Sequence, residues 1–346
     1  MSRALLVTGD LSNFGDALIA IIESEILLKK YDRVFLFAKK TATWTEGEIS
    51  GIKLGERLKV FGLDEFPLFS AHDLMVVGGG NMIRDGVGLS WVVKVISSAI
   101  ITRASGGKLV LFSIGNSKVT SWLRKVVFRI LFFLSNKVLF RDSASLMNAK
   151  LLSKKRALSV ANEIVLSNSK LIKNKFPKRS ESAFVVNVFS DSYESRVLNE
   201  DAVCKLIYRI LVENDLIENY HEISLVSHEE RKEFDERFLL ALKTKLASEY
   251  GLFSKMIPYE SVVNTMEVYR GCGYVVTNRL HSAILGEIYG AKVHAILDDS
   301  MKLNGWAFAL DWKIHDLSGS GSDNSSIEDF YISGNESCDF FKQITI

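Results

Sequence analysis

The sequence predicts an α/β protein with two doubly wound, Rossmann-like domains that face each other across a cleft. Two observations lead to this fold class. Short apolar runs rich in β-branched residues alternate with longer segments of helical period, and the alternation stops and restarts around a polar, basic stretch at 166–182. Polar or glycine-rich motifs also follow several of the predicted strands, which is where open α/β sheets bind ligands.

The first domain is predicted over residues 1–166. Its expected strands are nearly continuous in apolar residues, as strands covered on both faces are, and they lie at 4–8, 34–38, 74–77, 109–114 and 138–140. Between them apolar residues recur at helical spacing, which places helices at 16–30, 89–104, 119–134 and 143–152.

The second domain is predicted over residues 182–312, after the polar stretch that marks the boundary. Its strands are expected at 183–189, 223–226, 274–277 and 293–297. Its helices are expected at 201–213, 229–250, 261–269 and 279–289. Residues 313–346 are assigned to a C-terminal tail, in which the run 317–326 predicts a flexible connector and 330–346 a terminal helix or strand.

Bulk composition excludes several function classes. Lysine and arginine number 43 against 41 aspartate and glutamate, so the net charge of +2 gives no reason to expect a nucleic-acid partner. The cysteines Cys204, Cys272 and Cys338 lie far apart without metal-ligand spacing, so neither a metal site nor a disulfide framework is predicted. The N-terminus has no signal-peptide pattern, and Arg129 interrupts the apolar stretch 126–134, so we expect a cytoplasmic protein.

The segment GDLSNFGDALI follows the first predicted strand and opens a helix. Gly9 and Gly15 permit tight turns of the backbone. Asn13 suits a helix cap or unusual dihedral angles, and Asp16 is a good N-cap residue. The glycine spacing differs from the GxGxxG of dinucleotide sites, and an ordinary strand–turn–helix connection is the alternative to a ligand-binding loop.

Three consecutive glycines, 78–80, end the third predicted strand within VVGGGNMIRDG. Glycine runs lose backbone entropy on folding and place no side chains, so they commonly mark the close approach of a ligand or of another part of the chain. Gly79 and Gly80 are therefore candidate ligand contacts, and Asn81 and Arg84 would line the same rim. A purely structural glycine turn is the alternative.

The strand at 138–140 delivers Arg141 and Asp142 to the edge of the sheet, and Ser143 or Ser145 is expected to start the next helix. Taken alone, this pattern is typical of a surface Arg–Asp pair beside a serine cap. Taken with the other motifs, it makes Arg141 a candidate anion ligand.

The most informative motif is VVTNRLHSAILGEIYG, in which Thr277 or Asn278 is predicted to cap a helix that starts at Arg279. A cation at a helix N-terminus is disfavoured by about 0.3–1 kcal/mol, and a bound anion would reverse that cost. Backbone amides, a guanidinium and the imidazole of His281 together suit a phosphate or carboxylate, with Ser282 beside them. The alternative is a capped amphipathic helix with a solvated arginine and a packed histidine.

In this order the motifs resemble the polysaccharide pyruvyltransferase family, and the likeness runs from about Ala4 to Trp312. The motifs are NFGD after the first strand, GGG after a later one, FRDxxS, the strand-end His228, and NRLHS. By itself His228 can also be a cap or a surface residue. The resemblance implies a GT-B-like fold and an enzyme that uses phosphoenolpyruvate (PEP) as co-substrate, a glycan or lipid-linked glycan as acceptor, and no cofactor.

The resemblance also implies roles for residues. Arg279, with Leu280 and His281, matches the PEP-binding Arg-Leu-His of the family. His281 is the candidate acid or base because its unperturbed pKa lies near neutrality, and Asp16 is a second candidate base, toward the acceptor. Arg141 or Arg84 would supply a second cation for the anion. The predicted substrate-binding residues are Asn13, Gly15, Gly79, Gly80, Asn81, Arg84, Arg141, His228, Asn278, Arg279, Leu280, His281 and Ser282.

Two other functions stay open at this point. A GT-B glycosyltransferase would bind a nucleotide sugar with similar loops, and a non-catalytic glycan-binding protein could keep the same fold. The basic amphipathic segment 121–137 predicts either a peripheral contact with the inner face of a membrane or an ordinary crossover helix.

Overall fold

A computed structural model shows two compact units, the first over Met1–Asn168 and the second beginning at Ser169. We describe each unit by itself. The residues that the structure describes are 1–40, 48–49, 51–62, 72–152, 158–160, 163–180, 183–190, 198–217, 223–230, 232–297 and 302–317.

Unit 1 contains a parallel seven-stranded sheet in the order β5-β2-β1-β6-β7-β8-β9. Its strands are β1 (Arg3–Asp10), β2 (Arg33–Lys40), β5 (Leu58–Phe61), β6 (Leu74–Gly78), β7 (Lys108–Ile114), β8 (Lys137–Phe140) and β9 (Leu158–Val160). A small antiparallel pair, β3 (Glu48–Ile49) and β4 (Ile52–Lys53), accompanies it. Because all seven strands are parallel, their carboxyl ends lie along one edge of the sheet.

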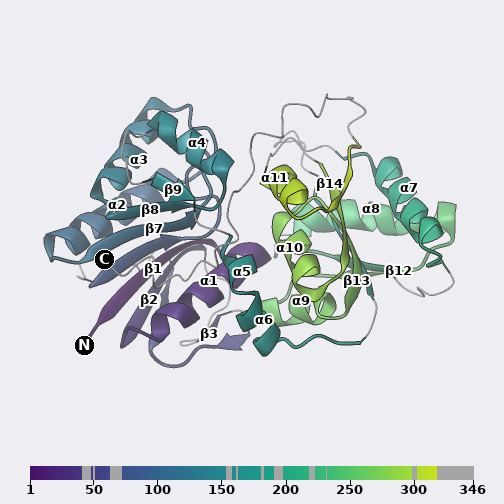
Figure 1. The fold of residues 1–346 in the computed structure, drawn as a ribbon, viewed down its shortest axis with the longest axis horizontal. Coiled ribbons are helices and arrows are strands. Elements are labelled where there is room, and N and C mark those ends of the chain that lie inside the picture. The colour runs from purple at the N-terminus through teal and green to yellow at the C-terminus, as the bar shows by residue number, and fades with distance from the viewer. Residues whose placement is uncertain are drawn as a thin grey trace. The chain divides into compact units, whose positions relative to one another are not determined.

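The helices of unit 1 cover both faces of this sheet (Figure 1). They are α1 (Phe14–Leu28), α2 (Leu89–Ala104), α3 (Trp122–Leu134), α4 (Ser143–Leu152) and α5 (Ile164–Ser167). The crossover from β1 to β2 runs opposite to the crossovers from β6 through β9, and such connections are right-handed, so α1 lies on one face and α2, α3 and α4 on the other.

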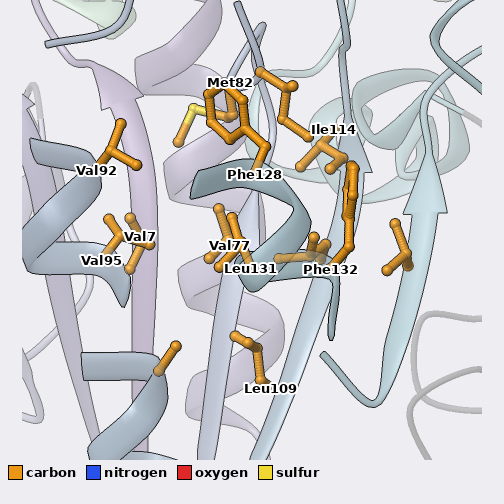
Figure 2. Packing of buried hydrophobic residues seen from close by; sticks show 14 of the residues in the cluster. Val7, Val77, Met82, Val92, Val95, Leu109, Ile114, Phe128, Leu131 and Phe132 are labelled. Atoms are coloured by element: carbon orange, nitrogen blue, oxygen red, sulfur yellow. The ribbon is translucent and has the colours of Figure 1, made fainter. Parts of the chain in front are cut away.

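The core of unit 1 forms where the α2–α4 layer meets the sheet (Figure 2). Val92 and Val95 of α2 and Phe128 and Phe132 of α3 pack onto strand residues such as Val77. Residues four apart lie on one side of a helix, which is why Phe128 and Phe132 point inward together.

Unit 2 contains a parallel six-stranded sheet in the order β12-β11-β10-β13-β14-β15. Its strands are β10 (Ala183–Asn187), β11 (Ile223–Val226), β12 (Ser254–Ile257), β13 (Cys272–Thr277), β14 (Lys292–Ile296) and β15 (Lys313–His315). Its helices are α6 (Ser169–Lys175), α7 (Glu200–Glu213), α8 (Lys232–Tyr250), α9 (Val262–Tyr269), α10 (Leu280–Tyr289) and α11 (Lys302–Ala309).

The two parallel sheets confirm the predicted α/β class, and the strands and helices predicted between residues 4 and 297 are present. The edge strands β5, β9, β12 and β15 were not predicted, because they are only partly buried and their sequences mix polar with apolar residues. β15 belongs to the second sheet, although the sequence assigns its residues to the tail. The stretch 166–182, expected as the domain boundary, contains the division between the two units at Asn168 and Ser169, together with α6 and the end of α5.

The predicted connector at 317–326 and the terminal element at 330–346 lie almost wholly outside the described residues. Within the part of the chain that is described, no helix combines the length and the apolar character that crossing a bilayer requires.

Candidate functional site

In unit 2, the candidate site residues gather where three neighbouring strands end. β11, β10 and β13 lie side by side, and their carboxyl ends lead into Ser227, Val188 and Asn278. Parallel strands place these three connections at one edge of the sheet, the usual ligand edge of open α/β sheets.

The connection from β13 to α10 is fixed by hydrogen bonds to β10 and to its own backbone. The hydroxyl of Thr277 donates to the carbonyl of Asn187 over 2.6 Å and accepts the backbone N–H of Arg279 over 2.8 Å. The amide of Asn278 accepts from the N–H of Phe189 and donates to its carbonyl, over 2.9 and 2.7 Å. Both side chains are buried, so they hold the loop in place.

The predicted cap of α10 is therefore wrong. Neither Thr277 nor Asn278 caps the helix, because both side chains are used to tie the loop to β10 and to turn it. The N-cap position is Arg279, whose side chain makes no capping hydrogen bond. The start of α10 thus keeps the partial positive charge of a helix terminus that receives no side-chain oxygen from its N-cap residue.

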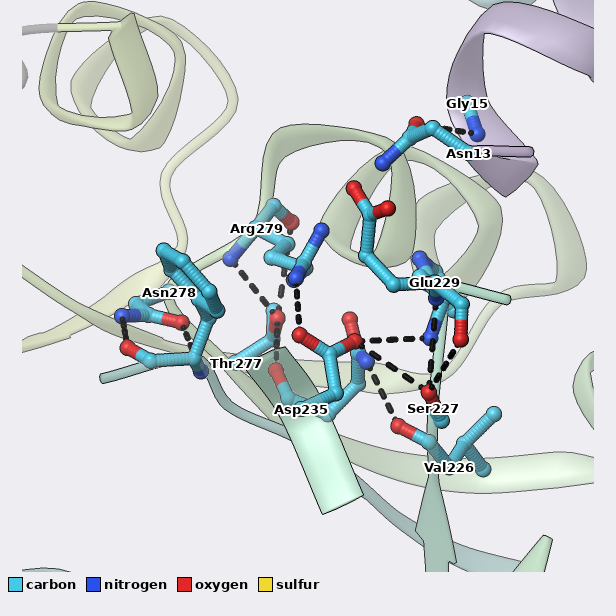
Figure 3. A network of polar contacts seen from close by, with 12 residues as sticks. Asn13, Gly15, Val226, Ser227, Glu229, Asp235, Thr277, Asn278 and Arg279 are labelled. Carbon is cyan, nitrogen blue, oxygen red and sulfur yellow. Dashed lines mark hydrogen bonds and ion pairs between the residues drawn. The ribbon is translucent and has the colours of Figure 1, made fainter. Parts of the chain in front are cut away.

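Arg279 already has an anionic partner within the protein. One of its terminal nitrogens forms an ion pair with the carboxylate of Asp235, a fully buried residue of α8 (Figure 3). Its guanidinium carbon also lies 4.6 Å from the ring centroid of Phe189, a cation–π contact. The guanidinium is therefore fixed in position, and Asp235 balances its charge without a bound ligand.

Asp235 is the centre of this network, and the sequence analysis missed it. Its second oxygen accepts the backbone N–H of His228 over 2.9 Å and faces the hydroxyl of Ser227 at 3.4 Å. Figure 3 shows the carboxylate lying between Ser227 and Arg279. Asp235 and Arg279 are 44 residues apart in the chain. No local sequence pattern shows that an acidic residue of α8 pairs with an arginine at the start of α10.

His228 is buried and hydrogen-bonded, with 2% of its surface exposed, so it is neither a cap nor a surface residue. Its Nε2 lies 2.9 Å from the hydroxyl of Tyr269, which lies 2.6 Å from that of Ser282. Burial, with added effects from Arg279 and His281, holds the pKa of His228 well below its usual value. His228 is therefore neutral at pH 7, and the chain of polar groups links β11 to α9 and α10.

His281 stands in the first turn of α10 and is half-buried, whereas its neighbours Leu280 and Ser282 are buried. The structure places six of the predicted residues at one sheet edge of unit 2. They are His228, Asn278, Arg279, Leu280, His281 and Ser282. His281 is the half-buried histidine of this set, and its Nε2 atom is itself shielded from solvent.

In unit 1, the structure decides between the two residues that the sequence offered as the cap of the N-terminal helix. Asn13, not Asp16, is the N-cap of α1, and its side-chain oxygen accepts the N–H groups of Gly15 and Asp16 over 2.9 and 3.4 Å (Figure 3). Asp16 lies in the first turn, and its carboxylate accepts the backbone N–H of Asp10 over 3.0 Å. Both side chains thus shape the loop after β1.

The glycines at the end of β6 make room for α1. A Cβ atom on Gly78 would overlap the carboxyl of Glu23, one on Gly79 would overlap Ile19, and one on Gly80 would lie 2.8 Å from Asp16. These three residues stand on one side of α1, at helical spacing. The close approach that the glycines permit is therefore that of a neighbouring helix, and Gly79 and Gly80 also have φ angles of 61°.

Glu23 is buried behind these glycines without a hydrogen bond to either carboxyl oxygen from the residues described. Burial raises its pKa well above the usual value, and the nearby carboxyl groups of Glu163 and Asp16 add to the shift. Because a buried carboxylate is costly, the fold favours the protonated form of Glu23.

Arg141 lies at the same edge of the unit 1 sheet and is 3% exposed, so the expected surface pair is wrong. Its Nε donates to Asp142 over 3.2 Å, and its buried Nη2 has no hydrogen-bond partner in the described part of the chain. A Cβ on Gly115 would lie 3.1 Å both from this Nη2 and from the carbonyl of Gly80. Arg141 therefore points toward the backbone beside the glycine run.

The remaining predicted residues surround this edge. Asp142, rather than a serine, accepts the N–H of Ser145 at the start of α4 over 2.7 Å. Asn81 donates to the hydroxyl of Ser117 over 2.9 Å, and Arg84 is half-buried. Unit 1 thus brings together Asp16, Gly79, Gly80, Asn81 and Arg141, while the predicted cleft between the domains stays a prediction.

Among the described ranges, no group of three or more histidine, cysteine, aspartate or glutamate side chains is arranged to hold a metal ion. The positive helix terminus of α10 and the buried Arg141 both suit an anion instead.

Comparisons with known proteins place this geometry in context. The sequence profile of the family described as polysaccharide pyruvyl transferase matches residues 13–300. A search of curated protein sequences finds no significant match. In fold, the chain is similar to S. aureus MnaA in a co-structure with UDP, with a TM-score of 0.53 and 10% identity over 91% of this chain and 84% of that one.

The chain is also similar in fold to the UDP-GlcNAc 2-epimerase of Neisseria meningitidis bound to UDP-GlcNAc. The TM-score is 0.51 at 11% identity, over 95% of this chain and 90% of that one. Together with the two parallel sheets, these likenesses confirm the GT-B-like fold class, and at such low identity they bear on fold alone.

Proposed function

Because the chain belongs to the polysaccharide pyruvyl transferase family, we propose that it transfers the pyruvyl group of PEP to two hydroxyls of a glycan as a cyclic ketal. The acceptor is a polysaccharide or a lipid-linked glycan. The observation that carries the proposal is the start of α10, where a helix terminus without a side-chain cap stands between Arg279 and His281 at the edge of a central strand.

The reaction makes specific demands on the protein. The methylene carbon of PEP takes up a proton, which leaves an oxocarbenium-like centre at the adjacent carbon. Two sugar hydroxyls then form bonds to that carbon, the bond to the phosphate oxygen breaks, and inorganic phosphate leaves. Of the two protons that the hydroxyls release, one balances the proton gained by the methylene and the other leaves with phosphate or a base. An anion site and an acid–base group are therefore both required.

The anion site is assigned to the amide groups at the start of α10. Arg279 and Asp235 together carry no net charge, so the attraction for phosphate or carboxylate comes chiefly from the helix terminus. Arg279 contributes remaining N–H groups and a fixed loop geometry, because Asp235 and Phe189 hold its guanidinium in position.

We assign to His281 the role of the acid that protonates the methylene carbon of PEP. His228 suits that role poorly, because burial keeps it neutral and the hydroxyl of Tyr269 occupies its Nε2. We assign His228 to positioning, since the chain through Tyr269 and Ser282 fixes the first turn of α10. Asp16 and Arg141 of unit 1 are proposed to serve the acceptor and a second anionic group, respectively.

Thermal unfolding of the wild-type protein with PEP tests the anion site without knowledge of the acceptor. A ligand that binds only the folded state stabilises it by about 2.7 kcal/mol at 100 times its Kd. We expect PEP to raise the melting temperature, and His281→Gln to retain part of this shift while losing transfer activity. Asn199→Ala is the matched control and should leave the shift with PEP unchanged. It alters the cap of another helix of unit 2, α7, and the acidic residues Glu200 and Asp201 in the first turn of that helix repel anions.

Mass spectrometry of candidate glycans incubated with PEP and protein tests the reaction, with a pyruvyl ketal as the expected product. A melting shift with UDP-GlcNAc and none with PEP would instead indicate a nucleotide-sugar enzyme. Glycan binding without any release of phosphate from PEP would indicate a binding protein without catalysis.

A further inference from the structure

Unit 1 has an unusual outer surface over α2, α3 and α4, which we call the apolar-basic face. The chain exposes sixteen large apolar side chains among its described residues, and ten of them belong to these three helices. The ten are Leu89, Val93 and Ile100 of α2, Trp122, Leu123, Val126, Ile130 and Phe133 of α3, and Met147 and Leu151 of α4.

This exposure is not a by-product of core packing. α3 already buries Phe128, Leu131 and Phe132 against the sheet (Figure 2), so its outer side should be polar in a helix that meets only water. Instead Trp122, Val126, Ile130 and Phe133 follow one another at spacings of four, four and three residues, which places them along one side of the helix. Trp122 is 74% exposed and Phe133 is 83% exposed.

The same helices are strongly basic. None of their residues is acidic, whereas they carry Lys94, Arg103, Arg124, Lys125, Arg129 and Lys150. The whole chain holds nearly equal numbers of the two kinds of charge, so this imbalance is local. Arg103, Arg124 and Arg129 each donate to a backbone carbonyl, a contact that orients the guanidinium without cancelling its charge.

From this combination we infer that the apolar-basic face docks unit 1 on the surface of an anionic lipid bilayer. Trp122 and Phe133 would enter the headgroup region, where aromatic side chains are favoured, and the basic residues would attract anionic headgroups. A second copy of the chain fits the face poorly, because self-association would bring two sets of positive charges together. The docking is peripheral, and it does not rest on the proposed reaction.

Vesicle flotation of the full-length protein tests the proposal. We expect flotation with vesicles of phosphatidylcholine mixed with phosphatidylglycerol, little with phosphatidylcholine alone, and release at high salt. Trp122→Ser with Phe133→Ser should weaken binding by about tenfold or more, because two large apolar groups no longer leave water. Lys125→Gln with Lys150→Gln should weaken binding to the anionic vesicles selectively.

The matched control is Phe253→Ser, which removes a phenylalanine that is 79% exposed on unit 2 and should leave flotation unchanged. Unaltered melting curves would show that the variants fold, as expected for side chains that face water. The proposal is overturned if the wild type does not float with anionic vesicles, or if the Trp122/Phe133 variant floats as well as the wild type. It is also overturned if sedimentation shows a dimer that this variant dissociates, since the face would then be a protein interface.

Discussion

Glu23 of unit 1 and His228 of unit 2 are both buried ionisable side chains close to the ligand edge of their sheets, but they differ in charge type and in surroundings. In unit 1, Glu23 of α1 lies behind the glycine run, with no hydrogen bond to its carboxyl from the described residues. In unit 2, His228 is held by Tyr269 and by the carboxylate of Asp235. In unit 1, burial and two neighbouring carboxyl groups raise the pKa of an acid, whereas in unit 2 a polar network surrounds a base.

The difference teaches how each edge is organised. In unit 1 the glycines let a helix approach so closely that side chains fill the space a ligand might take. In unit 2 hydrogen bonds and an ion pair fix the loop before α10 while the helix start receives no side-chain cap. The stability of unit 1 should therefore depend on shape at this edge, and that of unit 2 on charge pairing.

The largest expected effect is on the ion pair of unit 2. Arg279→Ala leaves the buried carboxylate of Asp235 without its cation, and breaking such a pair costs about 3–5 kcal/mol. Denaturant unfolding measures this loss, and we expect transfer activity to fall with it. Arg279→Lys is the control that keeps the charge, and it should recover part of the stability. Equal stability of wild type and Arg279→Ala would contradict the role of the pair.

A smaller effect is expected at the glycine run of unit 1. Gly79→Ala places a methyl group against Ile19 and forces a non-glycine residue to a φ of 61°, which together cost about 2–4 kcal/mol. Gly106→Ala is the matched control, because Gly106 has a φ of 82° and open space around it. The difference between the two variants in unfolding free energy isolates the packing cost, and no difference would refute the close approach of α1.

The pH dependence of stability should distinguish the two units. Glu23 has a raised pKa, so above about pH 4.5 the unfolded state loses its proton while the folded state keeps it, and stability falls as pH rises. His228 has a lowered pKa, so below about pH 6.5 its imidazole takes up a proton in the unfolded state and stays neutral in the folded state. Stability therefore falls as pH drops.

Each group changes the free energy of unfolding by about 1.4 kcal/mol per pH unit between its two pKa values. Unfolding of Glu23→Gln and His228→Gln across this range measures both slopes. Glu23→Gln should flatten the loss above pH 4.5, and His228→Gln the loss below pH 6.5. His294, whose pKa burial lowers to about 3, should leave a residual acid slope in the second variant. Unchanged slopes would show that neither group titrates as described.

The smallest expected effect compares two asparagine caps. Asn13 and Asn199 each accept two backbone N–H groups at a helix start, and replacing either by alanine should cost about 1 kcal/mol. Asn13→Ala should also reduce pyruvyl transfer, because Asn13 shapes the candidate loop after β1, whereas Asn199→Ala should not. Equal activities of the two variants would remove Asn13 from the site.

The sequence by itself determined the architecture of both units. Runs of β-branched residues and helical periods are local signals, so the central strands and the bounds of α2 and α4 followed from them directly. The same local signals located the strand-end motifs that hold Arg141, His228 and Arg279. The edge strands were not predicted, because they are only partly buried and their sequences mix polar with apolar residues.

Only the tertiary structure decided what these motifs contact. Asp235 meets Arg279 across 44 residues, and α1 fills the space that the glycines of β6 leave open. The cap of α10 was misassigned, and that of α1 was left between Asn13 and Asp16, because asparagine, aspartate and threonine side chains can serve a helix, a turn or a neighbouring strand equally well. The choice among these partners depends on which segments the sheet brings together, and hydrogen bonds and ion pairs between distant segments leave no periodic trace in the chain.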